Sequence, residues 1–547
     1  MSNAKLLVCN CQKTMSIDGA RLAEALGRDE PLAVATELCR SECSIFESGL
    51  ATGQPIQVAC TQEAPLFAEI AEEADAVERV SFVNIRERAG WCDTPEAAVP
   101  KMAALLAEST YPSAPAGLTT LKSDGVCLVI ACDQVGVDAA ASLATELSVT
   151  LVLTQHDDVI LPRQSIFAVH AGRIRAASGR LGAFDVVADG FADLVPSSRG
   201  ALSFTMPRDG AKSRCDLIVD LSGNATPLFP PQARRDGYFR ADPASPVAVD
   251  RLVGEARDYI GEFEKPIYVV TEPEICAHSR SAKVGCSKCL NVCPTGAITP
   301  DGDHVAIDAA ICGGCGSCSA VCPTGAVEYA YPRRNDLVAR MQIMIGAYAG
   351  SGGTKPRLLL HDLSHGEDLI AALARFGNGL PHNVLPIGLH AVFQAGHTTL
   401  LAALASGFQD VVCLISPEHA HERPVLDAEC DLTHAILDGL GLGGPRVRVC
   451  ETTDPDVLDE VLRADLGEIP ELPRQTFATS GKKRELGRLA ITKLRDHALT
   501  REPENTASFE TLKLPEGAPY GQINVNTDGC TLCLACVSAC PADAISD

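Results

Sequence analysis

Short apolar runs alternate with amphipathic stretches along most of the chain. Near the start, KLLVC (5–9) and PIQVAC (55–60) are apolar runs of strand length, whereas RLAEALG (21–27) and PLFAEIAEEADA (65–76) space apolar residues three and four apart. The first pattern predicts strands and the second predicts amphipathic helices. Both predicted strands end in cysteines, and the carboxyl ends of parallel strands are where α/β folds usually hold ligands.

The same alternation returns twice further along. Residues 126–154, VCLVIACDQVGVDAAASLATELSVTLVLT, are typical of a strand, turn, helix and strand, the outline of a βαβ unit. Residues 333–478 alternate again, and a basic amphipathic helix is expected at 480–499. The strands and helices predicted between 333 and 478 are RLLLHD, HNVLPIG, DVVCLIS, RVRVCET, HTTLLAALASG and DPDVLDEVLRADLG.

Composition narrows the class of function. The 547 residues suffice for roughly three to five domains. A net charge of -24 argues against binding to nucleic acid or to an anionic membrane surface, because phosphate groups attract Lys and Arg clusters. We find no apolar run near the roughly 18 residues of a membrane span and no signal-peptide stretch, so we expect a cytoplasmic protein. Its 24 cysteines then indicate metal ligation rather than disulfides.

The densest cysteines lie near the middle of the chain. CGGCGSCSAVCPTGAV (312–327) has the spacing C-x2-C-x2-C-x3-C-P of half a bacterial two-cluster ferredoxin. This spacing lets three thiolates hold one cluster, and the proline after the fourth cysteine turns the chain away. A zinc site is the alternative, although zinc sites usually pair two C-x2-C units.

The other half of that ferredoxin is irregular. CSKCLNVCPTGAI (286–298) lacks its first cysteine at the usual place, and the nearest one upstream is Cys276. We expect an inserted loop, with a free thiol at Cys276 or a ligand at His278 as alternatives. The fourth cysteine of each half ligates the other cluster. The predicted ligands are therefore Cys276, Cys286, Cys289 and Cys322 for one [4Fe-4S] cluster, and Cys312, Cys315, Cys318 and Cys293 for the other.

The last residues repeat the motif once more. CTLCLACVSACPADAISD (530–547) offers Cys530, Cys533, Cys536 and Cys540 for a further cluster. By the ferredoxin pattern Cys540 should point to a second cluster, and no second half follows. Cys540 could fold back as fourth ligand, another cysteine could serve, or the natural protein could continue beyond 547. We favour the last as a hypothesis.

Four further segments carry a family resemblance. LLVCNCQKTM, ELCRSECS, VACTQEAPLF and NIRERAGWC occur in that order within about the first 95 residues. Together they resemble the N-terminal region of the heterodisulfide reductase A family. The resemblance implies a [4Fe-4S] cluster held by Cys9, Cys11, Cys39 and Cys60. Cys43 competes with Cys39, and the alternative for the whole group is a set of buried apolar cysteines.

The resemblance also implies a flavin-binding βαβ unit, which opens G-x-G-x-x-G in that family. Ala131, Asp133 and Gly136 stand at the three glycine positions here. The middle glycine lets the backbone approach a pyrophosphate, and Asp133 adds bulk and negative charge there. Thr154 stands about where an acidic ribose ligand would be. FAD is therefore possible but disfavoured.

Residues 333–478 faintly resemble the small iron–sulfur subunit that delivers electrons from hydrogenase to the same reductase. Only three cysteines lie in this stretch, so we predict an α/β scaffold without a cluster. His419 and His421 could seat a metal or belong to a polar loop. The basic helix could dock an acidic partner or be a solvated face.

These expectations combine into a multidomain α/β protein whose parallel-sheet domains are interrupted by ferredoxin-like 2[4Fe-4S] modules. The expected regions are 1–112, an N-terminal α/β cluster-binding domain; 113–240, a degenerate Rossmann-like α/β domain; 241–332, a 2[4Fe-4S] ferredoxin domain; 333–478, an α/β scaffold domain; 479–515, a basic helix and linker; and 516–547, a C-terminal half ferredoxin motif.

The function expected is electron transfer through three to four [4Fe-4S] clusters. We find no P-loop and no nucleophile–base constellation, so whether the chain is itself an enzyme stays open. By analogy the partners would be a hydrogenase, a formate dehydrogenase or a heterodisulfide-reductase-like complex. The alternatives are an FAD-dependent oxidoreductase of the heterodisulfide reductase A type and a cluster-bearing scaffold or assembly factor.

Overall fold

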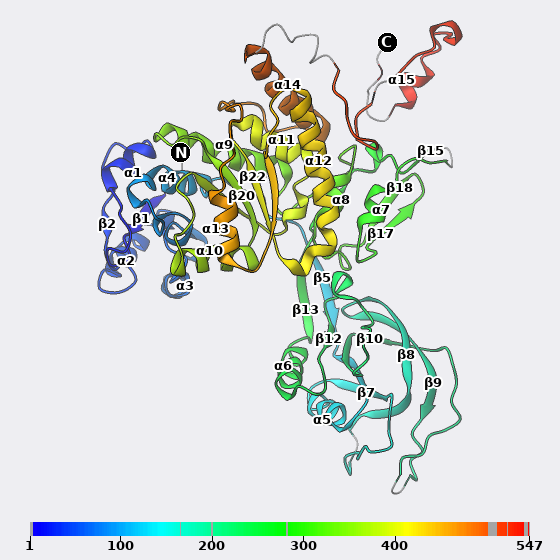
Figure 1. Ribbon diagram of the computed structural model, residues 1–547. Helices are drawn as coiled ribbons and strands as arrows, with labels where there is room; N and C mark the ends of the chain where they lie inside the picture. Colours follow the sequence, from blue (N-terminus) through cyan, green and yellow to red (C-terminus); the bar gives the residue numbers. More distant parts are fainter. Residues whose placement is uncertain are drawn as a thin grey trace.

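The chain folds into a multidomain α/β protein with parallel sheets, as the sequence predicts. The computed structural model describes residues 4–164, 166–198, 201–280, 283–501, 511–521, 523–540 and 545. Figure 1 shows a body made of three units, with a fourth unit hanging from it on two long strands and a C-terminal arm extending from the opposite side. Within the described residues, no helix combines the length and apolar character needed to cross a membrane.

The N-terminal unit is a parallel sheet covered by helices. Its strands lie in the order β2-β1-β3-β4. They are β1 (Lys5–Cys9), β2 (Val34–Ala35), β3 (Ile56–Val58) and β4 (Val80–Phe82). The helices are α1 (Gly19–Ala25), α2 (Ser44–Leu50), α3 (Ala64–Glu73) and α4 (Val99–Glu108). A π-helical turn, η2 (Arg86–Gly90), follows β4 and brings its charged residues to the carboxyl end of the sheet.

The hanging unit, which we call the Rossmann-like unit, contains a seven-stranded sheet in the order β10-β9-β8-β7-β6-β11-β12. Its strands are β6 (Val126–Ala131), β7 (Ser148–Leu153), β8 (Ala168–Arg180), β9 (Ala183–Asp193), β10 (Ala211–Cys215), β11 (Leu217–Leu221) and β12 (Tyr238–Arg240). Strands β6, β7, β8, β11 and β12 run parallel, while β8, β9 and β10 pair antiparallel. Helices α5 (Gln134–Leu143) and α6 (Pro246–Arg257) pack together beside it.

Two antiparallel strands tie this unit to the body. Strand β5 (Leu118–Ser123) leads in and β13 (Gly261–Pro266) leads out, and they pair along their whole length. At their base the N–H of Ile267 donates to the carbonyl of Gly117 at 2.7 Å. The chain therefore enters and leaves the Rossmann-like unit at one point, and this paired stalk is visible in Figure 1.

The cysteine-rich region extends from β14 to β19, between the stalk and the scaffold unit, and is built from short elements. Helices α7 (Lys288–Val292) and α8 (Ser317–Val321) lie against each other. The strands are β14 (Val269–Thr271), β15 (Ser279–Arg280), β16 (Lys283–Val284), β17 (Ile298–Asp301), β18 (His304–Ile307) and β19 (Val327–Tyr329). Strand β14, the first of the region, pairs with β19, the last. Strands β17 and β18 form a hairpin.

The scaffold unit is a four-stranded parallel sheet in the order β21-β20-β22-β23. Its strands are β20 (Arg357–Asp362), β21 (Val384–Leu389), β22 (Val411–Ile415) and β23 (Val447–Glu451). Its helices are α9 (Arg334–Gly350), α10 (His365–Phe376), α11 (His397–Ser406), α12 (Arg423–Gly439) and α13 (Pro455–Arg463). Strands β21 and β22 and the middle of β20 are continuous apolar runs, as expected for a parallel sheet covered on both faces, whereas the edge strand β23 is only partly buried.

One hydrophobic core joins the N-terminal unit, the scaffold unit and the basic helix α14 (Lys483–Arg501). Met102 of α4 and Met341 of α9 are fully buried where these helices pack together. Leu486 and Leu494 of α14 are buried against α11. The basic helix is thus a packed element with one charged side, and these three parts share one core.

The C-terminal arm, the part of the chain that follows Tyr520, has little contact with that core. Its described elements are η9 (Thr527–Gly529) and the short helix α15 (Ala535–Ala539). Tyr520 fixes the base of the arm, because its hydroxyl lies 3.0 Å from Nε2 of His397. Beyond that point the side chains are mostly exposed, and the arm projects away from the body in Figure 1.

Candidate iron–sulfur sites

The cysteine-rich region is arranged around its two short helices. Cys289 lies on α7 and Cys318 lies on α8, and both side chains are buried. Cys293 and Cys322 terminate these helices in extended backbone conformations, each followed by Pro-Thr-Gly-Ala. The two copies of the motif therefore face each other, which is the arrangement that lets the last cysteine of each half reach the other half.

One group of thiols gathers around Cys289. Burial, and then the thiols of Cys322, Cys286 and Cys276, raise the pKa of Cys289 to about 11. Cys276 therefore lies with the cysteines of α7, despite its distance along the chain. Four thiols are the donor set that [4Fe-4S] clusters use, and coordination to iron removes the cost of ionising them in a buried place.

A second group gathers around Cys318. Burial raises the pKa of Cys318 well above its usual value, and the thiols of Cys315, Cys312 and Cys293 raise it further. Cys289 of the first group also contributes, so the two groups are neighbours. The structure thus brings together both crossed sets that the spacing predicts.

Hydroxyl and amide groups surround the sulfurs at the helix ends. The N–H of Val327 donates to Sγ of Cys322 at 3.4 Å. The hydroxyls of Thr295 and Thr324 lie 3.5 and 3.7 Å from the sulfurs of Cys293 and Cys322. The threonine of each Pro-Thr-Gly-Ala repeat therefore has a role that the sequence repeat alone did not reveal. Hydrogen bonds to sulfur are one way in which a protein tunes a cluster potential.

A buried lysine from α14 holds the end of α8. The ammonium group of Lys483 donates to the carbonyls of Ser319, Ala320 and Cys322 at 2.8, 2.6 and 2.9 Å. Burial lowers the pKa of Lys483 to about 8. Burial by itself would raise the pKa of the Cys322 thiol. Lys483 and the N–H of Val327 act in the opposite direction and more strongly, so the pKa of Cys322 is lowered. In the sequence, Lys483 is one of several basic residues in the same helix, and nothing there indicates this contact.

The N-terminal cysteines meet at the carboxyl end of the first sheet. Burial raises the pKa of Cys39, and among its neighbours Cys60 and Cys9 raise it further. The pKa of Cys60 is raised in the same way, with Cys11 as its cysteine neighbour. By contrast, burial and Glu47 raise the pKa of Cys43, which precedes α2. Cys60 and Cys9 thus act on Cys39, whereas no cysteine contributes to the shift of Cys43, although all four pack against the same core.

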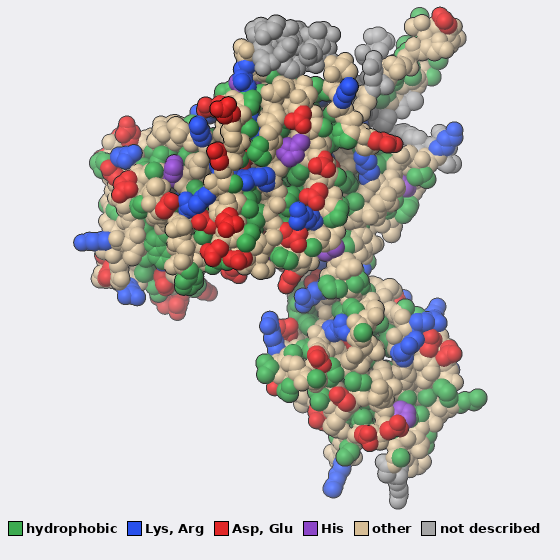
Figure 2. Space-filling view, in the orientation of Figure 1, with side chains coloured by type: hydrophobic (Ala, Val, Ile, Leu, Met, Phe, Trp, Pro, Cys, Tyr) green, Lys and Arg blue, Asp and Glu red, His purple; other side chains and the backbone are tan. Residues whose placement is uncertain are grey.

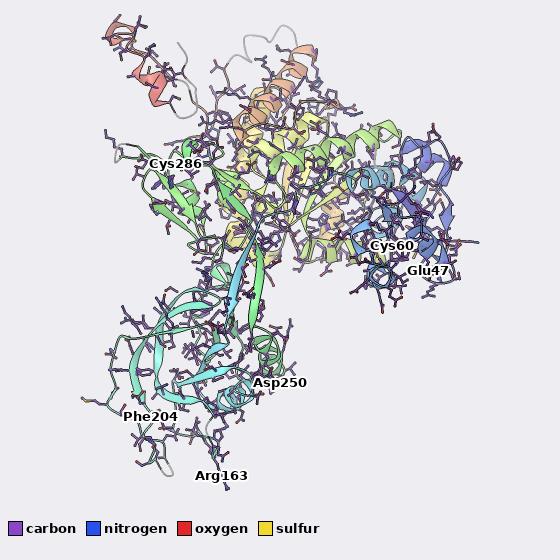
Figure 3. The ribbon with its side chains drawn as sticks, turned by 180° about the vertical axis from the view of Figure 1, so that it is seen from behind. Glu47, Cys60, Arg163, Phe204, Asp250 and Cys286 are labelled. Carbon is purple, nitrogen blue, oxygen red and sulfur yellow. The ribbon has the colours of Figure 1, made fainter. Side chains whose placement is uncertain are left out.

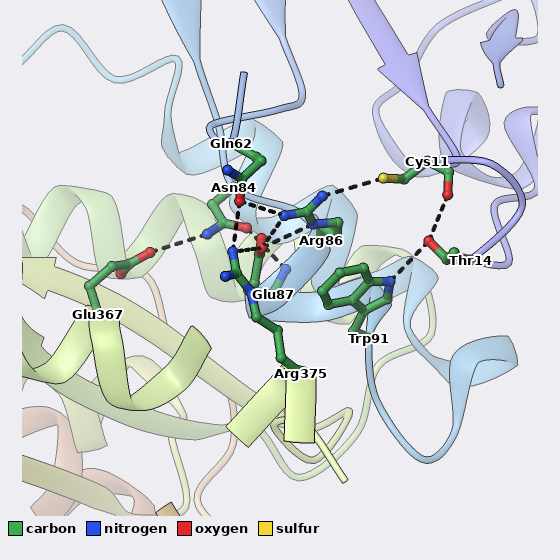
Figure 4. Close-up of polar contacts among 9 residues, drawn as sticks. All are labelled: Cys11, Thr14, Gln62, Asn84, Arg86, Glu87, Trp91, Glu367 and Arg375. Atoms are coloured by element: carbon green, nitrogen blue, oxygen red, sulfur yellow. Dashed lines mark hydrogen bonds and ion pairs between the residues drawn. The ribbon is translucent and has the colours of Figure 1, made fainter. Parts of the chain in front are cut away.

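A guanidinium group lies against one of these sulfurs. Nη1 of Arg86 donates to Sγ of Cys11 at 3.3 Å, and the guanidinium lies over the ring of Trp91, 4.4 Å from its centroid (Figure 4). Arg86 also pairs with the buried carboxylate of Glu87. Although burial opposes the shift, Arg86 lowers the pKa of Glu87, so the carboxylate stays ionised and holds the guanidinium in place.

The same turn connects this group of thiols to the scaffold unit. Arg375 of α10 donates to Glu87 at 3.1 Å and to Gln62 at 2.7 Å. Nη2 of Arg88 lies 2.6 Å from Oε2 of Glu367, also on α10. Several of these contacts are drawn in Figure 4. In Figure 3, Cys60 and Cys286 lie on opposite sides of the body, so the scaffold unit separates the N-terminal thiols from the cysteine-rich region.

The C-terminal cysteines are in a different environment. Cys530, Cys533 and Cys536 are exposed and Cys540 is half-buried. The backbone N–H of Ala535, and then the hydroxyl of Thr531, lower the pKa of Cys533. Residues 541–544, which complete the last motif, lie outside the described residues.

At the predicted flavin position the protein satisfies its own polar groups. Asp133 caps α5, and its carboxylate accepts from the N–H of Gly136 at 3.2 Å. Thr154 donates from its hydroxyl to the carbonyl of Ala131 at 3.1 Å. A Cβ atom on Gly136 would come within 2.3 Å of the Ala131 Cβ, so Gly136 serves close packing of helix on strand. This packing is one of the three roles of glycine in dinucleotide-binding turns.

The cysteines of the scaffold unit are buried in apolar surroundings. Cys413 lies in β22 and Cys450 in β23, while Cys430 lies on α12. His419 and His421 lie in an exposed turn before α12, with ring centroids 6.2 Å apart. Across the described ranges, no three His, Cys, Asp or Glu side chains converge as ligands of one metal ion would. The thiolates of a [4Fe-4S] cluster each bind a different iron and so lie further apart.

Comparison with known families supports iron–sulfur binding at two places. A 4Fe-4S dicluster domain matches residues 284–326, and a 4Fe-4S binding domain matches residues 523–546. Cys276 precedes the first match, while the other seven predicted ligands of the cysteine-rich region lie within it. No curated protein matches the chain. The protein therefore contains ferredoxin-type domains and is an iron–sulfur cluster-binding protein.

Proposed function

We propose that the protein relays single electrons through several [4Fe-4S] clusters, as a subunit or partner of a larger redox complex. The observation that carries this proposal is the pair of crossed thiol sets around Cys289 and Cys318. Two clusters held this closely by one small region can exchange electrons. The protein contributes their spacing and their potentials, which it tunes through burial and hydrogen bonds to sulfur.

The proposed ligands are those expected from the sequence. The first cluster of the cysteine-rich region takes Cys276, Cys286, Cys289 and Cys322, and the second takes Cys312, Cys315, Cys318 and Cys293. A third cluster takes Cys9, Cys11, Cys39 and Cys60, because these four thiols meet at one sheet edge. A fourth takes Cys530, Cys533 and Cys536, with Cys540 as its remaining cysteine.

FAD is not part of the proposal at the Rossmann-like unit. A pyrophosphate would bind at the start of α5, where Asp133 already accepts the N–H of Gly136. The likeness of the first 95 residues to the heterodisulfide reductase A family suggests hydrogenase, formate dehydrogenase or heterodisulfide-reductase-like partners. The two ends of the relay would then be the half-buried N-terminal thiols and the exposed C-terminal arm.

The test is the iron and sulfide content of protein assembled anaerobically, together with EPR spectra of its reduced form. About sixteen irons per chain would support four clusters and about twelve would support three, at four irons each. Reversible reduction at low potential would support electron transfer. A chain with its full iron content but without a reversible signal would instead be a scaffold. Flavin released on denaturation would contradict the exclusion of FAD.

A further inference from the structure

A cavity of about 1200 Å³ lies where the Rossmann-like unit, the cysteine-rich region and the scaffold unit meet. Cys293, Cys312, Cys315 and Cys318 line one of its sides. A [4Fe-4S] core of eight atoms there would fill only part of the space. Pockets for small molecules measure about 300–1,000 Å³, so ample room remains beside the cluster. Figure 2 shows the constriction between the body and the Rossmann-like unit at this level.

The wall opposite the cysteines is the carboxyl edge of the scaffold sheet. Asp362 ends β20, while His390 and Ser416 directly follow β21 and β22, and all three line the cavity. The chain passes from β20 to β21 on one side and then to β22 on the other, so the strand order reverses at β20. Open α/β sheets bind their ligands in the crevice at such a switch point. The cavity thus lies between the switch-point edge of this sheet and the cysteines of the second proposed cluster.

The walls disfavour a phosphate group. At the start of α10, the carboxylate of Asp362 accepts from the N–H groups of Ser364 at 2.9 Å and Gly366 at 3.3 Å. A phosphate would otherwise bind these groups. Lys265 pairs with Asp236 at 2.7 Å, and the guanidinium of Arg235 donates to backbone carbonyls, among them that of Ala233 at 2.8 Å. These donors are therefore occupied by the protein. The lining also carries five carboxylates against three cations, the third of which is the exposed Arg234, so the walls disfavour an anionic ligand.

Ring side chains line the same walls. Tyr268 and His390 are stacked, with centroids 4.6 Å apart and planes inclined by 16°. Burial lowers the pKa of His390, which favours the neutral form of its ring. Phe393 meets His419 edge to face at 6.2 Å, and His421 lies beside it. His419 and His421 are exposed at the rim, so they can exchange protons between water and the cavity.

We propose that this cavity binds a small quinone, a planar ring that takes up two electrons and two protons. The proposal rests on the electron-transfer function proposed above. Two electrons pass one at a time from the cluster of Cys293, Cys312, Cys315 and Cys318, which a low-potential donor protein reduces again after each transfer. Two protons pass from water through His419 and His421. Both carbonyls of the quinone become hydroxyls, and the donor is oxidised by two electrons.

The test uses protein with its full iron content, reduced with dithionite and freed of excess reductant under argon. Stopped-flow absorption follows cluster reoxidation by menadione and, separately, by cytochrome c, which is too large to enter the cavity. Gln232→Trp places a bulky ring at an exposed position of the cavity wall. We expect calorimetry to detect no menadione binding to this variant. Reoxidation of its clusters by menadione should be at least about tenfold slower than in the parent protein. The cytochrome c rate should not change.

The double variant H419Q/H421Q separates proton delivery from binding. Under menadione saturation, which removes any change in affinity, it should reduce menadione at least about tenfold more slowly than the parent. His156→Gln, a substitution in the Rossmann-like unit away from the cavity lining, should leave menadione binding and reduction unchanged. An equal loss with both acceptors, unchanged menadione rates, or tighter binding of riboflavin than of menadione would each overturn the proposal. A fully loaded, reducible protein that does not react with menadione would overturn it and leave the electron-transfer function intact.

Discussion

The cysteine-rich region and the C-terminal arm carry nearly the same motif in opposite surroundings. In the cysteine-rich region two copies face each other, Cys289, Cys318 and Cys322 are buried, and Lys483 reaches in from another unit to hold a helix end. In the arm a single copy projects from the body, and Cys530 and Cys533 are exposed. Spacing of cysteines therefore specifies cluster chemistry but leaves the environment of the cluster to the rest of the chain.

The arm also exposes apolar side chains around its motif. Leu532 is 80% exposed and Leu534 is 47% exposed, and both have positive φ angles in the loop between the cysteines. Ala542 stands in the sequence where the other two copies have Thr295 and Thr324. A cluster in the arm would thus lack the hydroxyl that lies near sulfur in the other copies. The difference predicts a more accessible and more labile cluster there.

Replacing one ligand in each region should produce the largest difference. Cys289→Ser removes a buried ligand, so we expect the loss of at least about four irons and a lower midpoint of thermal unfolding. Cys533→Ser should remove about four irons while leaving that midpoint unchanged, because the arm lies outside the core. Iron analysis and calorimetry measure both effects. Cys92→Ser is the control and should keep all irons; equal destabilisation by both ligand variants would remove the contrast.

Iron release should occur in two phases. We expect a chelator in air to remove about four irons from the arm at least about tenfold faster than the rest, because exposed clusters meet oxygen and chelator directly. The absorbance of the iron–chelator complex follows the release. The fast phase should be absent from the Cys533→Ser variant. A single phase in the parent protein would show that the body protects the arm as well as the cysteine-rich region.

Lys483→Met tests how the body supports the cysteine-rich region. The substitution leaves three buried carbonyls without a donor, which should lower the free energy of unfolding by about 2–4 kcal/mol. The neighbouring Lys482 is exposed and pairs with Glu272 at 2.9 Å, so Lys482→Met should cost less than about 1 kcal/mol. Urea unfolding followed by cluster absorption compares the two. Similar losses would mean that the carbonyl contacts contribute nothing specific.

Arg86→Gln should have the smallest effect and extends the comparison to the N-terminal thiols. A guanidinium donating to a thiolate stabilises the more negative, reduced cluster, so its removal should lower the potential by about 50 mV, close to a factor of ten in the equilibrium constant. EPR-monitored redox titration measures the shift. Arg88→Gln is the matched control in the same turn, because Arg88 pairs with Glu367 instead of sulfur. A shift of the same size in both variants would indicate loosening of the turn.

Local patterns were enough to predict the α/β class and the two ferredoxin-type domains. The crossed sets follow from the spacing of the two central motifs, and the strands of the scaffold unit follow from their apolar runs. The different surroundings of Cys39 and Cys43 could not be predicted from the sequence, because the two are only four positions apart in one turn. The contacts of Lys483 and Arg86 could not be read from the sequence at all. Each joins residues far apart in the chain, and local propensity carries no information about such pairs.

The stalk formed by β5 and β13 makes residues 118–266 an insertion whose two ends lie side by side. Such a segment can be gained or lost in one genetic event, since joining Gly117 to Ile267 needs only a short linker. A shortened chain would keep the shared core but lose the cavity wall that contains Gln232. One side of the cavity would then open to water. The presence or absence of this segment could thus divide related proteins into those that select a small acceptor and those whose clusters serve any carrier able to touch them.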